Sequence, residues 1–344
     1  MKKISPEDYG YRIGEYEKGE HNQITDVPGV KVGHCTYDKG RCHTGVTVIL
    51  PVEGSVYAKK PVAAVYVLNG YGKTAGTVQI DELGVLESPV ALTNTLNVGK
   101  VLDALTEYTI TTEAMSGRSV LSFNGVAGET NDSRINDITV RPIGFDEVMQ
   151  AVSEADTEFA EGSYGAGRGT VCMGLKGGIG SSSRIIPFGK EQFTIGVLVQ
   201  SNFGRTEDLM IAGDPVGRRI TKQLESFSEA DQGSIMIVLG TDLPLTERQL
   251  KRVLKRSAAG LVRTGSCMGH GSGDVMIGFS TGNCLPDRYT HRFVEMKAFP
   301  ENQLDAVFRA AAECTEEAII CSLLNADACE GLHGEIYHSL REFL

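Results

Sequence analysis

The chain has 344 residues, of which 41% are hydrophobic and 22% charged, so it is long enough to bury a substantial core in one large domain or two ordinary ones. Its net charge of −11 at pH 7 argues against a surface that follows nucleic-acid phosphates. The first twenty residues lack the apolar core of a signal peptide and no later run is long enough to span a bilayer, so we expect a cytoplasmic protein without nucleic-acid or membrane partners.

Short apolar strands alternate with amphipathic helices along the chain. Nearly continuous apolar runs are typical of strands that are covered on both faces. Such runs lie at residues 46–50, 62–68, 194–199, 235–239 and 275–279. Their order, interleaved with helical patterns, favours the α/β (α+β) class with strands buried between other layers.

Three helical segments are predicted from the spacing of apolar residues. The first covers residues 145–159. The second begins after Thr246, which has the capping-box spacing with Gln249, and ends before Gly265. The third is one helix or a helix pair within 302–328. Because no linker rich in proline and serine separates these elements, we expect one continuous domain of two packed sheets flanked by helices.

Two glycine-rich stretches, 165–169 and 176–184, superficially suggest phosphate binding. The lysine stands before the glycines and no helix follows, so neither stretch matches a P-loop or a dinucleotide fingerprint, and turns are the preferred interpretation. A cysteine and histidine group near the C-terminus lacks the paired short spacing of a zinc site; it consists of Cys314, Cys321, Cys329 and His333. We therefore expect no metal and no cofactor.

A glycine and a serine stand directly before one of the predicted strands. Asp231, Gln232 and Gly233 precede Ser234, which opens the apolar run 235–239. Such a pair is commonly only a turn before a strand. If the Gly233–Ser234 bond is broken, however, Ser234 gains an α-amine with a reference pKa of about 7.7 to 8.0, which can act as general base for its own hydroxyl. One internal cut would create both the nucleophile and its base.

Several blocks of the sequence resemble the DmpA-type aminopeptidases, also called the β-aminopeptidase or L-aminopeptidase/D-esterase family. Residues 233–265 resemble the segment that opens the small subunit in that family. The other blocks occur along the chain in the same order as in the family. They lie at 24–34, 92–95, 128–130, 165–184, 197–204 and 271–274. The resemblance therefore extends over nearly the whole chain.

The resemblance implies a fold and a processing event. The fold would be a four-layer α-β-β-α sandwich, similar to the N-terminal-nucleophile hydrolases but with its own connectivity, and related in architecture to the ornithine acetyltransferases. Residues 1–344 would form a single catalytic domain that cleaves itself into a large subunit, 1–233, and a small subunit, 234–344. The processed protomers would assemble into a homotetramer.

The resemblance also implies catalytic roles. Ser234 would be the nucleophile, and Asn202, just after a predicted strand, would line the oxyanion hole. Ser272 would act as a relay oriented by Asp274, and the two lie on the same side of an extended segment, although a turn is the plainer interpretation of their pattern. His270 invites a comparison with Ser-His-Asp triads, but the family supplies no such triad.

A glutamate is the candidate anchor for the substrate ammonium. In the resembling enzymes the residue that matches Glu129 is placed to hold that group, whereas the pattern alone is equally compatible with an exposed loop carboxylate. Where better-known members have a tyrosine after the Glu-Thr pair, this chain has Asn131. An amide donates a hydrogen bond with different reach and acidity from a phenol, so the substrate range stays open.

The sequence thus predicts a self-processing serine aminopeptidase or amidase. It would release N-terminal residues from short peptides, amino-acid amides or esters through an acyl-enzyme on Ser234. One alternative is an acyltransferase of the ornithine-acetyltransferase type, which Ser234 disfavours because those enzymes use threonine. The other is an uncleaved, inactive binding or scaffold homologue, which Asn131 keeps open.

Overall fold

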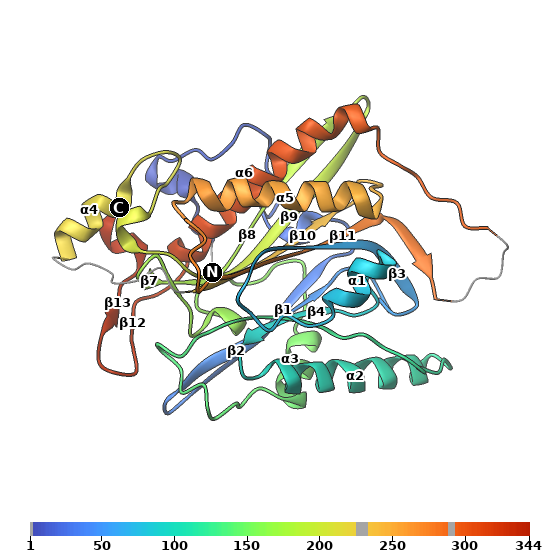
Figure 1. The fold of residues 1–344 in the computed structure, drawn as a ribbon, viewed down its shortest axis with the longest axis horizontal. Helices are drawn as coiled ribbons and strands as arrows, with labels where there is room; N and C mark the ends of the chain where they lie inside the picture. The colour runs from blue at the N-terminus through green and yellow to red at the C-terminus, as the bar shows by residue number, and fades with distance from the viewer. Residues whose placement is uncertain (1–2, 225–232, 288–292) are drawn as a thin grey trace.

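Two β-sheets pack face to face, and helices cover the outer side of each sheet (Figure 1). The structure is a computed structural model that describes residues 3–224, 233–287 and 293–344. Gly233 and Ser234 are therefore described, whereas Asp231 and Gln232, which precede the predicted cleavage bond, lie outside the described residues.

One sheet has four strands in the order β1-β2-β4-β5. The strands are β1 (Lys31–Lys39), β2 (Cys42–Leu50), β4 (Val90–Asn94) and β5 (Val126–Thr130). The pair β4 and β5 is parallel and the other pairs are antiparallel. Because parallel neighbours need a crossover, helix α2 (Val98–Met115) connects β4 to β5. Helix α2 packs with α3 (Phe145–Ser153) on the outer face of this sheet.

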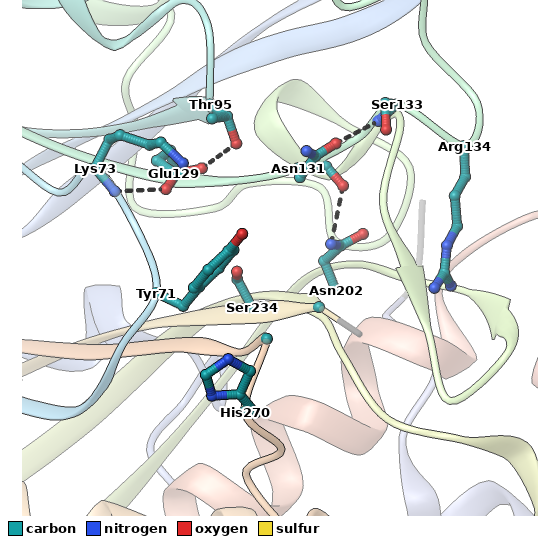
Figure 2. Close-up of a pocket in the computed structure, with 12 residues that line it drawn as sticks. Tyr71, Lys73, Thr95, Glu129, Asn131, Ser133, Arg134, Asn202, Ser234 and His270 are labelled. Atoms are coloured by element: carbon teal, nitrogen blue, oxygen red, sulfur yellow. Dashed lines mark hydrogen bonds between the residues drawn. The ribbon is translucent and has the colours of Figure 1, made fainter. Parts of the chain in front are cut away.

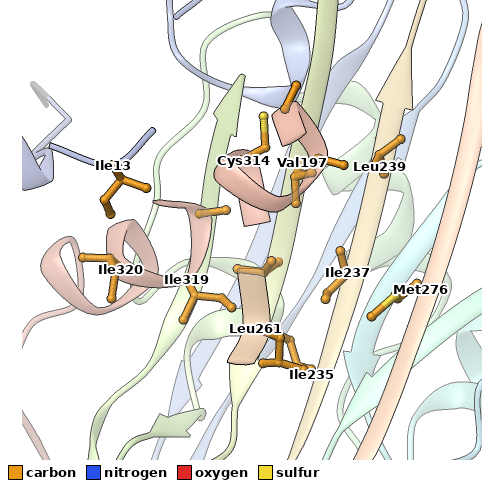
Figure 3. Close-up of a cluster of buried hydrophobic side chains, with 14 of the residues drawn as sticks. Ile13, Val197, Ile235, Ile237, Leu239, Leu261, Met276, Cys314, Ile319 and Ile320 are labelled. Carbon is orange, nitrogen blue, oxygen red and sulfur yellow. The ribbon is translucent and has the colours of Figure 1, made fainter. Parts of the chain in front are cut away.

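The second sheet has five strands in the order β3-β11-β10-β9-β8. They are β3 (Lys59–Gly70), β8 (Gly178–Phe188), β9 (Glu191–Asn202), β10 (Ser234–Thr241) and β11 (Gly273–Pro286). Only β10 and β11 are parallel, and α5 (Glu247–Arg263) makes their crossover. Helix α6 (Leu304–Leu324) lies beside α5 over the outer face, where apolar side chains from helices and strands interdigitate (Figures 1 and 3).

Strand β10 shows how the sandwich is built. Ile235, Ile237 and Leu239 belong to the apolar cluster under the helices, whereas Met236 and Val238 belong to the cluster between the two sheets. Alternate residues of a strand point to opposite faces, so a continuous apolar run supplies both layers. A third apolar cluster joins the four-stranded sheet to α2 and α3. The expected α-β-β-α architecture is confirmed.

Smaller elements complete the chain. They are helices α1 (Thr77–Leu83) and α4 (Val216–Leu224), and the short strands β6 (Val171–Cys172), β7 (Leu175–Lys176), β12 (Cys329–Glu330) and β13 (Ile336–Tyr337). Short 3₁₀ turns occupy Pro6–Tyr9, Ile24–Asp26, Gly165–Gly167, Thr206–Asp208, Glu301–Gln303 and Leu340–Phe343. Within the described ranges, every helix is too short or too polar to cross a membrane.

The structure corrects two sequence predictions and decides between the two alternatives of a third. The helix expected at 145–159 ends at Ser153, because Asp156 leaves the helix to pair with Val32 through two backbone hydrogen bonds of 3.0 and 3.1 Å. The third helical segment is one continuous helix, α6. The glycine-rich stretch 176–184, expected to form turns, enters β8 at Gly178.

All eight cysteines are free thiols. Five are buried, and these include Cys314 and Cys321 in α6. Cys329 belongs to β12 and is partly exposed, so it lies outside the helix that holds Cys314 and Cys321. Burial raises the pKa of the Cys314 thiol to about 12, which keeps that sulfur protonated near neutral pH.

Candidate active site

The predicted site residues meet at one end of the two sheets. Strands β5 and β9 end there and β10 and β11 begin there. These ends surround a cavity of about 600 Å³. It is lined by Tyr71, Lys73, Thr95, Glu129, Asn131, Ser133, Arg134, Asn202, Gly233, Ser234, His270 and Gly271 (Figure 2). A cavity of this size suits a small ligand.

Ser234 is the first residue of β10 and lies between β9 and β11. In the two ladders it pairs with Asn202 and with Gly273. The backbone N–H of Gly273 donates to Ser234 Oγ at 3.2 Å and also to the carbonyl oxygen of Gly233 at 3.2 Å. One backbone donor therefore contacts both the hydroxyl and the carbonyl of the predicted cleavage bond.

Two glycines allow the backbones to approach each other around that bond. A Cβ atom on Gly233 would lie 2.0 Å from the carbonyl oxygen of Asn202. A Cβ atom on Gly273 would lie 2.5 Å from the carbonyl oxygen of Tyr71 and 3.1 Å from Ser234 Oγ. Both distances to backbone oxygens are too short for a Cβ atom. Only glycine at these two positions therefore allows the neighbouring backbones to lie this close to Ser234.

Asn202 is the last residue of β9, so the strand extends three residues beyond the apolar run 194–199. The side chain is held from two sides. Its Oδ1 accepts from the backbone N–H of Val171 at 2.9 Å, and its Nδ2 donates to the carbonyl oxygen of Asn131 at 3.0 Å. An amide nitrogen has two hydrogens, and one of them is used in the second bond. The side-chain amide is thus fixed at the cavity wall beside Ser234.

Ser272 and Asp274 flank Gly273, the residue whose N–H contacts the Ser234 hydroxyl. Ser272 Oγ donates to Asp274 Oδ1 at 2.6 Å, which confirms the expectation that the two side chains lie on the same side. Both side chains are buried, with 2% and 1% of their residue surface exposed. The pair therefore lies in the protein interior next to the start of β10, and not on the cavity wall.

Glu129 lies in β5 and is only 4% exposed, so the alternative interpretation as an exposed loop carboxylate is wrong. One carboxylate oxygen accepts from the backbone N–H of Lys73 at 2.8 Å, and the other accepts from the hydroxyl of Thr95. Both donors are electrically neutral groups. The carboxylate is held in position at the cavity wall without consuming its charge in these two bonds.

Asn131 takes part differently from the expectation. Its side-chain Oδ1 accepts from the backbone N–H of Ser133 at 3.0 Å, which forms a local turn in the loop after β5. The contact with Asn202 is made by the Asn131 backbone carbonyl. The backbone of this residue, and not its side chain, orients the neighbouring amide.

Asp132, the next residue in the chain, stabilises the same loop. Asp132 is buried and accepts from the Thr44 hydroxyl at 2.6 Å and from Asn136 Nδ2 at 2.9 Å. Burial raises its pKa to about 6. The loop that carries Asn131 is therefore tied to β2 through a buried carboxyl group.

Lys176 is a buried residue that stabilises a loop. Its ammonium group is fully buried and donates to the carbonyl oxygens of Gly167, Thr170 and Gly177 at 2.6 to 3.0 Å. Burial lowers its pKa to about 7. Because the lysine faces backbone carbonyls inside the protein, it is not placed to bind a phosphate, and it holds the loop whose Val171 contacts Asn202.

Sequence reasoning missed Tyr71, Lys73 and Arg134, and it set aside His270, although all four line the cavity. Tyr71 and Lys73 follow the end of β3, and the Lys73 ammonium lies 5.7 Å from the Tyr71 ring centroid. The His270 ring lies 6.3 Å from that of Tyr71. Arg134 lies in the loop after β5. Arg134 stands close to the recognised block 128–130, whereas Tyr71 and Lys73 belong to no recognised block.

Comparisons with known proteins identify the family of the chain. The profile described as Peptidase family S58 matches residues 22–337. The chain is 35% identical to the Beta-peptidyl aminopeptidase BapA of Sphingosinicella microcystinivorans over 340 residues, which covers 92% of this chain and 84% of the relative.

Two solved structures are similar over nearly the whole chain. The PH0078 protein from Pyrococcus horikoshii OT3 is 42% identical with a TM-score of 0.92, over 98% of this chain and 96% of that one. The L-aminopeptidase D-Ala-esterase/amidase from Ochrobactrum anthropi, described as a variant of the Ntn hydrolase fold, is 33% identical with a TM-score of 0.90, over 98% and 95%. The chain therefore belongs to peptidase family S58, and it is an aminopeptidase with the fold of the N-terminal-nucleophile hydrolases.

Proposed function

We propose that this aminopeptidase activates itself by cleaving the Gly233–Ser234 bond and then uses Ser234 as an N-terminal nucleophile. The observation that carries the proposal is that this bond lines the same cavity as Glu129 and Asn202. The bond to be cut, an anion for the substrate amine and an amide for the oxyanion are gathered around one space.

In the maturation step, Ser234 Oγ attacks the carbonyl carbon of Gly233. The new C–O bond forms as the C–N bond breaks, and the leaving nitrogen, which becomes the α-amine of Ser234, takes the hydroxyl proton. The N–H of Gly273 contacts the Gly233 oxygen, where negative charge develops in this step. Water then opens the ester, which leaves fragments 1–233 and 234–344.

In turnover, the free α-amine of Ser234 accepts the proton of its own hydroxyl as that oxygen attacks the substrate carbonyl. Asn202 Nδ2 donates its second hydrogen to the tetrahedral oxyanion. The protonated amine then gives its proton to the leaving amine, and water hydrolyses the acyl-enzyme. Ser272, oriented by Asp274, acts as a positioning and relay group for the amine from the interior side.

Glu129 positions the substrate by holding its ammonium group. Its two neutral hydrogen-bond donors keep the carboxylate in place while its charge serves the substrate cation. The substrates are short peptides, amino-acid amides or esters, in keeping with the relatives named as β-peptidyl aminopeptidase and as L-aminopeptidase D-Ala-esterase/amidase. Asn131 contributes its backbone carbonyl to this site, as the acceptor that orients Asn202.

Intact mass spectrometry together with an aminopeptidase assay tests the proposal. Wild-type protein is expected to give fragments 1–233 and 234–344 and to hydrolyse amino-acid p-nitroanilides. Ser234→Ala is expected to remain one chain and to be inactive. The control Ser119→Ala, which changes an exposed serine far from Ser234 in the sequence, is expected to behave like the wild type. A full-length wild-type species that keeps its activity after long incubation would contradict the mechanism.

The cytoplasmic location and the homotetramer expected from the sequence are part of the same proposal. Light scattering on the processed protein is expected to give the mass of four protomers. Fractionation of the source cells is expected to recover the activity with cytosolic markers. A monomeric active species would overturn the tetramer without affecting the chemistry of Ser234.

A further inference from the structure

The cavity has a carboxylate on one side and a guanidinium on the other. Figure 2 shows Glu129 and Arg134 on opposite sides of Ser234 and Asn202, and all four residues line the cavity. A substrate whose ammonium group lies at Glu129 and whose carbonyl lies at Ser234 extends its leaving residue away from Glu129. That direction leads toward the arginine.

The backbone that presents Arg134 is fixed. The carbonyl oxygen of Arg134 accepts from the N–H of Leu332, in the hairpin between β12 and β13, at 3.0 Å. On either side of it in the chain, Asp132 is buried and hydrogen-bonded and Ile135 is 1% exposed. A loop anchored in this way places Arg134 at a defined position on the cavity wall, which is what a recognition site requires.

The chemistry of the side chain indicates what it recognises. A guanidinium group presents planar paired donors that match a carboxylate in a bidentate arrangement. The α-carboxylate of a dipeptide is the anion that lies on the leaving side of its only peptide bond. A C-terminal amide of the same dipeptide has the same length but lacks the negative charge.

We infer that Arg134 binds the α-carboxylate of the leaving residue, so that free dipeptides are preferred substrates of this enzyme. The inference rests on the proposed function, because it takes Glu129 as the amine anchor and Ser234 as the nucleophile. It assigns a second anchor to the site and a substrate class that is charged at both ends. Lys73, the other flexible cation of the cavity, has its ammonium beside Tyr71 and its backbone N–H on Glu129, so it belongs to the amine side.

The test compares kcat/KM for L-alanyl-L-alanine and β-alanyl-L-alanine with kcat/KM for the C-terminal amide of each. Wild-type enzyme is expected to prefer the better free dipeptide over its amide by about tenfold or more, as for a charge-assisted hydrogen bond. Arg134→Met is expected to bring this ratio to about 1, because the guanidinium is the group that distinguishes a carboxylate from an amide. Arg134→Lys keeps the charge without the paired donors, and an intermediate ratio is expected.

Lys73→Met is the matched control, since it removes a cation of the same cavity from the other side. Its ratio of free dipeptide to amide is expected to stay at the wild-type value. Equal kcat/KM for acid and amide in the wild type, or an unchanged ratio in both Arg134 variants, would overturn the inference alone. Absence of hydrolysis of every dipeptide and p-nitroanilide by wild-type protein would instead overturn the proposed function. Should Arg134→Met fail to fold, the wild-type ratio and Arg134→Lys still decide the question.

Discussion

Two of the sites with buried charged side chains in the described part of the molecule are built differently. At the cavity, Glu129 accepts hydrogen bonds from neutral donors of Lys73 and Thr95. Beneath α6, Arg184 is fully buried and pairs with Glu313 at 3.2 Å and with Glu317 at 2.6 Å. A carboxylate whose partners are neutral donors can still pair with a cationic ligand. Carboxylates paired with a buried cation are already neutralised inside the protein.

The second group, which we call the Arg184 cluster, consists of Lys18, Arg184, Glu313 and Glu317. Lys18 Nζ lies 2.6 Å from Glu317, and Arg184 also donates to the carbonyl oxygens of Ile13 and Ser183. Burial opposes ionisation of Glu317, but Arg184 and Lys18 outweigh it and lower the pKa of that carboxyl. The cluster ties the N-terminal segment, β8 and α6 together, and nothing in its geometry faces the cavity.

The largest expected effect comes from breaking the Arg184 cluster. Glu317→Gln leaves the buried guanidinium without its nearest anion, which is expected to lower the free energy of unfolding by about 3 to 5 kcal/mol. Activity per folded molecule is expected to persist at moderate temperature. Arg309→Ala, which removes an exposed ion pair with Glu15, is the control, and its expected cost is below about 1 kcal/mol. Denaturant unfolding of both variants checks the contrast, and equal losses would contradict it.

A somewhat smaller effect, on rate and not on stability, is expected at the cavity wall. Asn202→Ala is expected to lower kcat about 10² to 10³-fold, the range for loss of one oxyanion donor. The measurement is steady-state kinetics on an amino-acid p-nitroanilide, with Asn302→Ala, an exposed asparagine, as the control. A kcat within a factor of three of the wild type would remove Asn202 from the mechanism.

Removing the charge of Glu129 sharpens the comparison between the two groups. Glu129→Gln keeps the shape of the side chain but loses its negative charge, so kcat/KM for substrates with a free ammonium is expected to fall about 10 to 100-fold. The melting temperature is expected to change little, because the partners in the protein are neutral. A loss of stability like that of Glu317→Gln, with unchanged kcat/KM, would show that Glu129 is structural.

The smallest effect is expected at a histidine that lies in neither group. His34 contacts Thr47 Oγ1 at 2.8 Å and the Ala160 carbonyl at 3.0 Å, and burial lowers its pKa from 6.5 to about 4. Between pH 4 and 6.5 the unfolded chain therefore binds more protons than the folded one, so this contribution to stability is lost as the pH falls through that window. His34→Gln is expected to flatten the dependence of melting temperature on pH between about 6.5 and 4.5 relative to the wild type. Parallel curves for the two proteins would contradict the assignment.

Local sequence signals predicted the elements whose burial and boundaries depend on residues close to one another in the chain. The apolar run 235–239 lies in β10, and Thr246 caps α5 with Gln249 as its spacing indicates. Helix α2 was missed because its second half, rich in threonine, has no clear helical apolar period. It forms because the parallel pair β4 and β5 requires a crossover, which is a property of the sheet.

The candidate site residues Ser234, Asn202 and Glu129 were likewise proposed from sequence, through blocks that resemble one family, and the structure places them around one cavity. Their surroundings were not predicted. Sequence alone did not reveal that the Asn131 side chain turns into its own loop, that Lys176 is buried against three carbonyls, or that Arg134 and Glu129 lie on opposite sides of Ser234 in the cavity (Figure 2). Each of these depends on residues distant in the chain that the strands bring together.

The sequence by itself thus determined which layers form and which hydroxyl stands at the head of a buried strand, because apolar periodicity and a glycine before a serine are local properties. Only the tertiary structure decided that Gly273 N–H reaches both Ser234 Oγ and the Gly233 carbonyl, since this contact joins two strands 39 residues apart. It also decided which carboxylates are held by neutral donors and which are paired with cations. The physical reason is that hydrogen-bond partners and burial are set by the packing of distant segments, whereas the pattern along the chain records only which side of an element is apolar.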